Sequence, residues 1–176
     1  MKKIGLLSDT HSYLDDRILT YFQDCDEIWH AGDIGNINIL DALKAFKPFR
    51  GVYGNIDGFQ IRAELPLDLE FQCEGVAVFM THIGGYPGKY NPRVGKILRE
   101  NPPTKGLFIC GHSHILKIMP DLQLDFLHIN PGACGNEGWH KVKTLIKFIL
   151  DQGQIRDLQI IELGKGGIIL GNEKME

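Results

Sequence analysis

The chain has 176 residues, of which 43% are hydrophobic and 23% are charged, and its formal net charge is −3. This length and composition favour one globular domain over residues 1–176 that buries its core without disulfides, and the mild acidity argues against a nonspecific nucleic-acid binder, which would carry a basic excess. No apolar stretch approaches the length of a membrane span, and the apolar run at residues 4–7 is too short for a signal peptide, so we expect a cytoplasmic protein without a membrane partner.

The first third of the chain alternates between strand and helix patterns. Buried-strand patterns occur in "KIGLLS", "EIWHA" and "FRGVY". Apolar residues recur at helical spacing over residues 15–25 and 37–46. This β-α-β-α-β order predicts a mainly parallel sheet with crossover helices.

After Asp57 the pattern changes. The run "VAVFMT" predicts a strand ending at His82, and a glycine-rich loop, a helix over residues 93–99 and the strand "GLFICG" follow it. From Ile115 onward the segments are typical of strands and turns, and "KVKTLIKFILDQGQIRDLQIIEL" predicts a hairpin turning at residues 151–154, although its first half also has a helical interpretation. We therefore expect an α/β fold with a second sheet stacked on the first, and fraying of the last few residues.

The four cysteines are scattered and lack CxxC spacing, so we expect buried free thiols rather than disulfides or metal ligands. Ser113 has no nucleophile-elbow context, and we expect it to be structural. His30 is expected to be a strand residue or to support the site from behind, while His128 and His140 are expected in surface or structural roles.

Polar side chains follow five of the predicted strands at the point where each strand ends. They are Asp9 and His11, Asp33, Asn55 and Asp57, His82, and His112 and His114. Ligands of open α/β sheets gather outside the carboxyl ends of the strands. Residues two apart in an extended chain lie on one side, so a pair such as His112 and His114 can bind one ion, or one ion each of a pair roughly 3.5–4 Å apart.

These carboxylate and amide oxygens and four imidazoles are too many ligands for one ion and suit two. Nitrogen and oxygen ligands without sulfur favour Mn, Fe, Zn, Ni or Co, and the imidazoles argue against Mg or Ca. An isolated DxH is commonplace, and "GD" and "GN" after strands usually indicate only turns. Together and in this order, the residues predict a metal site.

The ordered motifs resemble those of the calcineurin-like metallophosphoesterases, and the short chain and "NPG" at residues 130–132 resemble the small bacterial and archaeal phosphodiesterase branch. The resemblance implies two stacked mixed β-sheets flanked by helices, and two divalent transition-metal ions, with Mn²⁺ the best expectation. It implies a first ion held by Asp9, His11 and His114, a second held by Asn55, His82 and His112, and Asp33 as the bridge between them.

The chain departs from the family pattern at Ile56, where the family often has a histidine that donates a proton to the leaving group. Isoleucine has no such proton, so we expect a phosphodiesterase that prefers activated aryl diesters. Attack by a metal-bridging hydroxide would need no protein nucleophile. Asp33 and Asn55 are the expected catalytic residues, with Asp57 either orienting a ligand histidine or capping the turn.

Three alternatives stay open. The retromer complex contains a non-catalytic subunit of this fold and similar size, so a protein-binding scaffold is one of them. A phosphomonoesterase and a nuclease are the others, although a small phosphoester substrate is expected rather than long nucleic acid. Homo-oligomers are compatible with the sequence.

Overall fold

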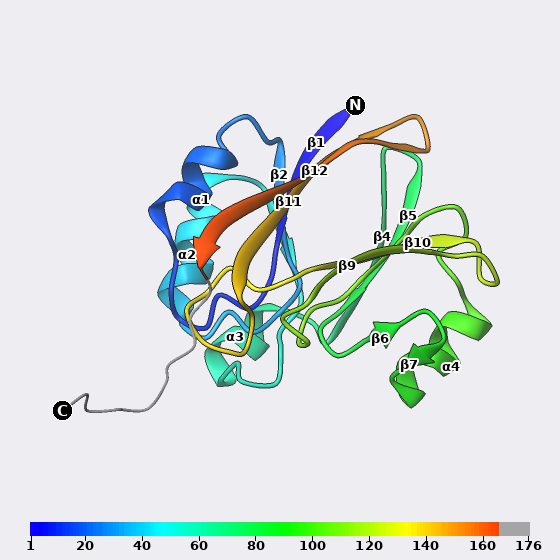
Figure 1. The fold of residues 1–176 in the computed structure, drawn as a ribbon, viewed down its shortest axis with the longest axis horizontal. Helices are drawn as coiled ribbons and strands as arrows, with labels where there is room; N and C mark the ends of the chain where they lie inside the picture. Colours follow the sequence, from blue (N-terminus) through cyan, green and yellow to red (C-terminus); the bar gives the residue numbers. More distant parts are fainter. Residues whose placement is uncertain (166–176) are drawn as a thin grey trace.

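The computed structural model describes residues 1–165, which form two five-stranded sheets lying face to face (Figure 1). The first sheet has the order β12-β11-β1-β2-β3. Its strands are β1 (Lys2–Leu7), β2 (Glu27–His30), β3 (Phe49–Gly51), β11 (Val142–Asp151) and β12 (Gln154–Lys165). The first three strands run parallel, as predicted, and β11 pairs antiparallel with both β1 and β12.

The second sheet has the order β4-β5-β8-β10-β9. Its strands are β4 (Asp68–Cys73), β5 (Val76–Thr81), β8 (Leu107–Ile109), β9 (Leu116–Asp121) and β10 (Phe126–Pro131). The three central strands are parallel, and β4 and β9 are antiparallel edges. Both sheets are therefore mixed, which confirms the predicted fold. A two-stranded ribbon, β6 (Gly85–Tyr86) and β7 (Lys89–Tyr90), forms within the glycine-rich loop.

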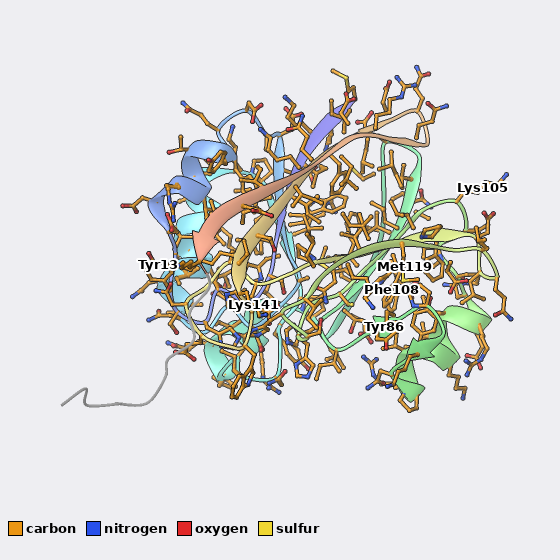
Figure 2. The ribbon with its side chains drawn as sticks, in the orientation of Figure 1. Tyr13, Tyr86, Lys105, Phe108, Met119 and Lys141 are labelled. Atoms are coloured by element: carbon orange, nitrogen blue, oxygen red, sulfur yellow. The ribbon has the colours of Figure 1, made fainter. Side chains whose placement is uncertain are left out.

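Helices cover the outer face of each sheet (Figure 1). They are α1 (Asp16–Tyr21), α2 (Ile37–Phe46) and α3 (Phe59–Glu64) on the first sheet and α4 (Pro92–Glu100) on the second. Side chains fill the space between the sheets (Figure 2), where Trp29 packs edge-on against Phe148, with ring centroids 5.6 Å apart. Burial of these apolar faces, at roughly 25 cal/mol per Å², is the main stabilising contribution.

Several expectations about local structure are confirmed and others are wrong. The hairpin is present, and both of its arms are strands, so the helical interpretation of its first half is wrong. The first helix is shorter than the predicted residues 15–25, and α3 and β4 had not been predicted. All four cysteines are buried and free. Within the described residues, no helix is long and apolar enough to cross a membrane. The predicted fraying falls outside the described residues.

Candidate metal centre

Each sheet contains three mutually parallel strands, and the loops that follow these strands meet at one place in the molecule. The loops that follow them are tied together by backbone hydrogen bonds: Asp9 N donates to the Gly32 carbonyl at 3.0 Å, and Gly111 N donates to the His82 carbonyl at 3.0 Å. The loop after β10 joins them, because Gly135 N donates to the Asp9 carbonyl at 3.0 Å. Residues far apart in the chain are thereby brought to one site.

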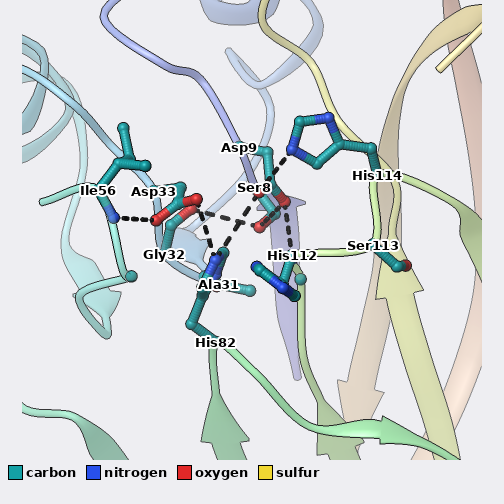
Figure 3. Close-up of polar contacts among 12 residues, drawn as sticks. Ser8, Asp9, Ala31, Gly32, Asp33, Ile56, His82, His112, Ser113 and His114 are labelled. Carbon is teal, nitrogen blue, oxygen red and sulfur yellow. Dashed lines mark hydrogen bonds and ion pairs between the residues drawn. The ribbon is translucent and has the colours of Figure 1, made fainter. Parts of the chain in front are cut away.

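Six of the seven predicted ligands gather in two groups in this site (Figure 3). Asp9, His11 and His114 form one group, and Asp33, His82 and His112 form the other; within each group the ligand atoms lie within 4.8 Å of one another. Apart from Asn55, these groups contain the residues that the family resemblance implied for each ion, with Asp33 falling in the second group. Oδ2 of Asp33 lies 3.1 Å from Nε2 of His82 and 3.6 Å from Nε2 of His11, so this oxygen faces an imidazole of each group.

Each buried carboxylate is held by one oxygen and presents the other to the histidines. Oδ2 of Asp9 accepts hydrogen bonds from the Ser8 hydroxyl at 2.6 Å and from His112 N at 3.2 Å. Its Oδ1 lies 3.2 Å from Nε2 of His114 and has no hydrogen-bond partner within residues 1–165. Oδ1 of Asp33 accepts from the backbone N–H of Ile56 at 3.0 Å, which leaves Oδ2 for the imidazoles.

The imidazole of His82 is oriented in the same manner. Its Nδ1 lies 2.8 Å from the carbonyl oxygen of Ala31 and therefore donates to it, so in the neutral ring Nε2 carries a lone pair. That lone pair faces the carboxylate oxygen Oδ2 of Asp33. The lone pairs of the nitrogen and of the oxygen repel each other unless a cation lies between the two atoms. A ligand histidine that donates its other N–H to a carbonyl is the usual arrangement in metal sites.

The unpaired atoms test whether a divalent ion fits. In the described part of the chain, Asp9 Oδ1, His11 Nε2 and His82 Nε2 are buried without a hydrogen-bond partner. Leaving such a group unpaired costs about 1–3 kcal/mol. All three atoms belong to the two ligand groups, and nitrogen and carboxylate oxygen are ligands that transition metals accept. The residues therefore fit the metal ions that the sequence predicted.

Electrostatics also favours positive charge here. Burial alone would raise the pKa of the Asp9 carboxyl, but the neighbouring imidazoles of His11 and His114 outweigh burial and lower that pKa. The neighbouring Asp9 carboxylate raises the pKa of His11. Burial lowers the pKa of His82, yet the Asp33 and Asp9 carboxylates outweigh it and raise that pKa. These shifts show that the site favours positive charge beside its carboxylates, and a divalent cation would supply that charge.

Close approach explains the glycines that precede two of the ligands. A Cβ on Gly54 would lie 2.0 Å from Oδ1 and 2.4 Å from the backbone N of Asp33. A Cβ on Gly111 would lie 2.1 Å from the Ser8 hydroxyl oxygen and 2.9 Å from Oδ2 of Asp9. Each of these glycines therefore makes room for a carboxylate from another strand.

Left-handed backbone occurs at five of the seven candidate ligands. The φ angle is between 46° and 68° at Asp9, His11, Asp33, His112 and His114. This conformation is uncommon outside glycine, although Asp and His adopt it more readily than most residues. Such residues cost about 1–3 kcal/mol each and cluster at functional sites.

Two expected site residues, Asn55 and Asp57, are not members of either ligand group. Asn55 follows β3 and lines a pocket of about 280 Å³ together with His82. Asp57 accepts 2.7 Å hydrogen bonds from Gly35 N at one oxygen and from Gly54 N at the other. Of the two expectations for Asp57, these contacts favour loop fixation over the orientation of a ligand histidine. Its catalytic role remains a prediction.

Two residues support the site from behind: His30, for which this was one of the two expected roles, and Asn130, to which the sequence pattern assigned no role in the site. His30 is buried, accepts from Gly32 N at Nδ1 (3.1 Å), and lies 3.1 Å from the Thr10 hydroxyl at Nε2, so it holds the loops of both buried carboxylates. Burial lowers the pKa of His30 to about 4, which keeps this ring neutral. Nδ2 of Asn130 donates to the Gly111 carbonyl at 2.8 Å and to the Ser113 hydroxyl at 3.0 Å. Ser113 is thus a structural residue, as expected.

Comparisons with known proteins agree with this geometry. A profile of the calcineurin-like phosphoesterase superfamily domain matches residues 1–152. A probable metallophosphoesterase of Methanothermobacter thermautotrophicus is 29% identical over 137 residues, which cover 74% of this chain and 76% of that protein. A probable metallophosphoesterase of Methanocaldococcus jannaschii is 30% identical over 135 residues, which cover 74% of this chain and 67% of that protein.

Solved structures show the same fold. A Thermotoga maritima protein known from a solution structure is 26% identical and superposes with a TM-score of 0.70, covering 93% of this chain and 100% of that chain. A single mutant of Vps29 from Entamoeba histolytica superposes with a TM-score of 0.68 at 13% identity, covering 92% of this chain and 99% of that chain, a likeness of fold alone. Because the family profile spans residues 1–152, the chain belongs to the calcineurin-like phosphoesterase superfamily, a family of metal-dependent phosphoester hydrolases.

Proposed function

We propose that this protein is a dinuclear-metal phosphodiesterase, with Mn²⁺ as the preferred ion. The observation that carries the proposal is the position of Asp33, whose Oδ2 faces His11 of one ligand group and His82 of the other. A carboxylate placed in this way suits a bridge between two ions. Bound ions would lower the pKa of water to about 7, supply hydroxide for attack at phosphorus and stabilise the developing negative charge.

The chain's own residues would position the reactants. Asp33 bridges the two ligand groups, and the Ile56 N–H holds it in place. Asn55 would complete the second group, and Asp57 would fix the Asn55 loop through Gly54 N. The Ile56 side chain offers no proton to a leaving group, so esters with good leaving groups are the expected substrates.

Two pockets beside the second ligand group favour diesters over monoesters. The first contains Asn55 and His82 and has a volume of about 280 Å³. The second contains His112 and has a volume of about 340 Å³. Both linings include Ile83 and Asn91, so the pockets adjoin each other. A diester has two substituents to accommodate near the phosphorus, whereas a monoester has one.

The test is hydrolysis of bis(4-nitrophenyl) phosphate and 4-nitrophenyl phosphate by Mn²⁺-loaded protein. We expect the diester to have the higher kcat/KM, and Asp33→Asn to lower it by at least about 100-fold, because losing even an outer supporting group costs 10–100-fold. Asp41→Asn, an exposed position on α2, is the matched control and should behave as the parent does. Hydrolysis of the monoester alone would indicate a phosphomonoesterase. Equal rates for Asp33→Asn and the parent would refute the proposal.

A scaffold is the second candidate, because structures named Vps29 share the fold. Absence of transition metal after reconstitution would favour the scaffold. Metal retention alone does not separate the two, because a Vps29 of Entamoeba histolytica was solved with Zn²⁺, so the hydrolysis assay decides between them. Cleavage of single-stranded DNA would instead support a nuclease. We propose a small phosphoester as the partner, because the net charge of −3 does not favour long nucleic acid.

A further inference from the structure

The guanidinium of Arg62, on α3, binds the loop that carries Asn55. Its Nε donates to the carbonyl oxygen of Asp57 at 2.6 Å. Its Nη2 donates to the carbonyl oxygen of Asn55 at 3.1 Å and to that of Gly54 at 3.4 Å. All three acceptors belong to residues 54–57, which follow β3 and which we call the Asn55 loop. One side chain therefore holds the loop at three of its carbonyl groups.

The side chain of Asn55 depends on its own backbone for its position. It is exposed, and within residues 1–165 it neither donates nor accepts a hydrogen bond. The backbone N–H groups of the Asn55 loop are held by carboxylates, because Gly54 N donates to Asp57 and Ile56 N donates to Asp33. Arg62 holds the carbonyl side of the same loop. Loss of these three hydrogen bonds would free the segment that presents the Asn55 amide.

The guanidinium is itself fixed in place. Its Cζ lies 4.7 Å from the centroid of the Tyr53 ring, a cation–π contact with a half-buried residue. The planar guanidinium presents its donors in a rigid fork, so it can bind several carbonyl oxygens at once. Arg62 is thus a rigid support for the Asn55 loop, although it lies at the surface.

The charge of Arg62 does not explain its place beside a metal centre. Arg62 lines the pocket of about 280 Å³ that also contains Asn55 and His82. Arg93 lines the same pocket and is paired with the Asp68 carboxylate, whereas the contacts of Arg62 within residues 1–165 are to carbonyl oxygens and the Tyr53 ring. A cation that no carboxylate neutralises repels divalent ions. Any benefit of Arg62 to metal binding must therefore come from geometry.

We propose that Arg62 is a positioning residue for the second ion. By holding three carbonyl groups of the Asn55 loop, it keeps the Asn55 amide at the ligand group of His82 and His112, and so raises the affinity for that ion. The inference rests on the proposed function, because it requires two ions and Asn55 as a ligand. The first ion has no ligand on the Asn55 loop and should not depend on Arg62.

The test is calorimetric titration with Mn²⁺ of the parent and of Arg62→Met. We expect the substitution to weaken the second ion by about 10–100-fold, as loss of an outer supporting group does, and to leave the first ion unchanged. Electrostatics alone predicts the opposite sign, because removing a positive charge would tighten the binding of both ions. Arg62→Lys keeps the charge but loses the fork, so it should also weaken the second ion.

A double substitution separates positioning of Asn55 from general loosening of the fold. In Asn55→Ala the amide oxygen is already absent, so adding Arg62→Met should cause no further loss of affinity. Electron paramagnetic resonance gives a second measurement. At a Mn²⁺ concentration that gives the parent the signal of a spin-coupled pair, Arg62→Met should show the signal of isolated ions.

Arg156→Met is the matched control, because it removes the same charge from an exposed position on β12, and it should bind both ions as the parent does. Three results would overturn the positioning role and leave a dinuclear site intact: unchanged or tighter binding of the second ion in Arg62→Met, equal weakening of both ions, or a further loss in the double variant. If Arg62→Met does not fold, Arg62→Lys decides by the same comparison. A parent that binds fewer than two ions would overturn this inference and the proposed function together.

Discussion

Substitution of Gly54 by alanine should disable the metal centre although it replaces no ligand residue. The added Cβ would lie 2.0 Å from Oδ1 of Asp33, whereas ordinary contact begins near 3.4 Å, so the carboxylate must move by about 1.4 Å. The added Cβ would also lie 2.4 Å from the backbone N of Asp33, and a backbone atom cannot move aside as the end of a flexible side chain can. A misplacement of 1 Å at a reacting centre can reduce rate about 100-fold. Overpacking of this kind costs about 1–3 kcal/mol of stability.

Two measurements check this prediction. Mn²⁺ titration followed by calorimetry should show weaker binding in Gly54→Ala, and kcat/KM for the activated diester should fall about 100-fold. The control is Gly58→Ala in the same loop, because a Cβ on Gly58 meets nothing within 4 Å and its φ of −78° suits alanine. If Gly54→Ala binds Mn²⁺ and hydrolyses the diester as Gly58→Ala does, the close-packing explanation of the motif glycine is wrong.

Three other changes test the supporting structure. Asp57→Asn replaces one of the two acceptor oxygens with an NH₂ group that faces a backbone N–H. It should therefore lower the free energy of unfolding by about 1–3 kcal/mol even without metal. If Asp57 acted only in catalysis, the substitution would leave thermal stability unchanged. Phe148→Ala should cost about 3–5 kcal/mol in urea unfolding, because Phe148 is buried between the sheets; an effect below 1 kcal/mol would contradict that packing. Burial would raise the pKa of Glu27, but hydrogen bonds from Lys2, Trp29 and Arg50 outweigh burial and lower this pKa from its ordinary value of 4.5. The ionised Glu27 therefore stabilises the fold above about pH 4.5, and this contribution is lost as the pH falls through the folded-state pKa. The stability gap between parent and Glu27→Gln should therefore narrow below pH 4.5 in acid titrations of unfolding, and a constant gap would refute it.

Hydrophobic periodicity was sufficient to predict the strands of the first sheet and their crossover helices. Buried runs such as residues 4–7 pack on both faces, so they leave continuous apolar patterns. The helix α3 left no such pattern, because Ile61 is its only fully covered apolar residue. The edge strand β4 is mostly half-exposed and mixes polar with apolar residues, so its sequence is also typical of a loop. Elements that bury little of their surface cannot be identified from periodicity.

The sequence indicated the site residues because each follows a strand directly, and parallel strands bring their carboxyl ends together. A supporting role was one of the two expected for His30, whereas the contacts of Asn130 could not be predicted because its partners lie far away in the chain. Asn130 reaches the loop of His112 only after β8 and β10 pair. The unpaired ring of His128 is likewise a property of packing, since nothing in the sequence distinguishes it from an ordinary core histidine.

The cost of this arrangement argues for metal binding at the site. Left-handed backbone at Asp33 and His114 costs about 1–3 kcal/mol for each residue, and the unpaired Nε2 of His82 adds a comparable penalty. A surface that binds partners elsewhere on the molecule gains nothing from these features. Glycine at the left-handed positions would remove the backbone strain, and apolar side chains in place of the buried polar ones would remove the unpaired atoms. An ion bound between the two ligand groups would offset them all at once, because it pairs the orphaned atoms and neutralises the buried carboxylates. The destabilising features lie where bound metal would offset them, which is the thermodynamic pattern of a site in which folding and metal binding are coupled.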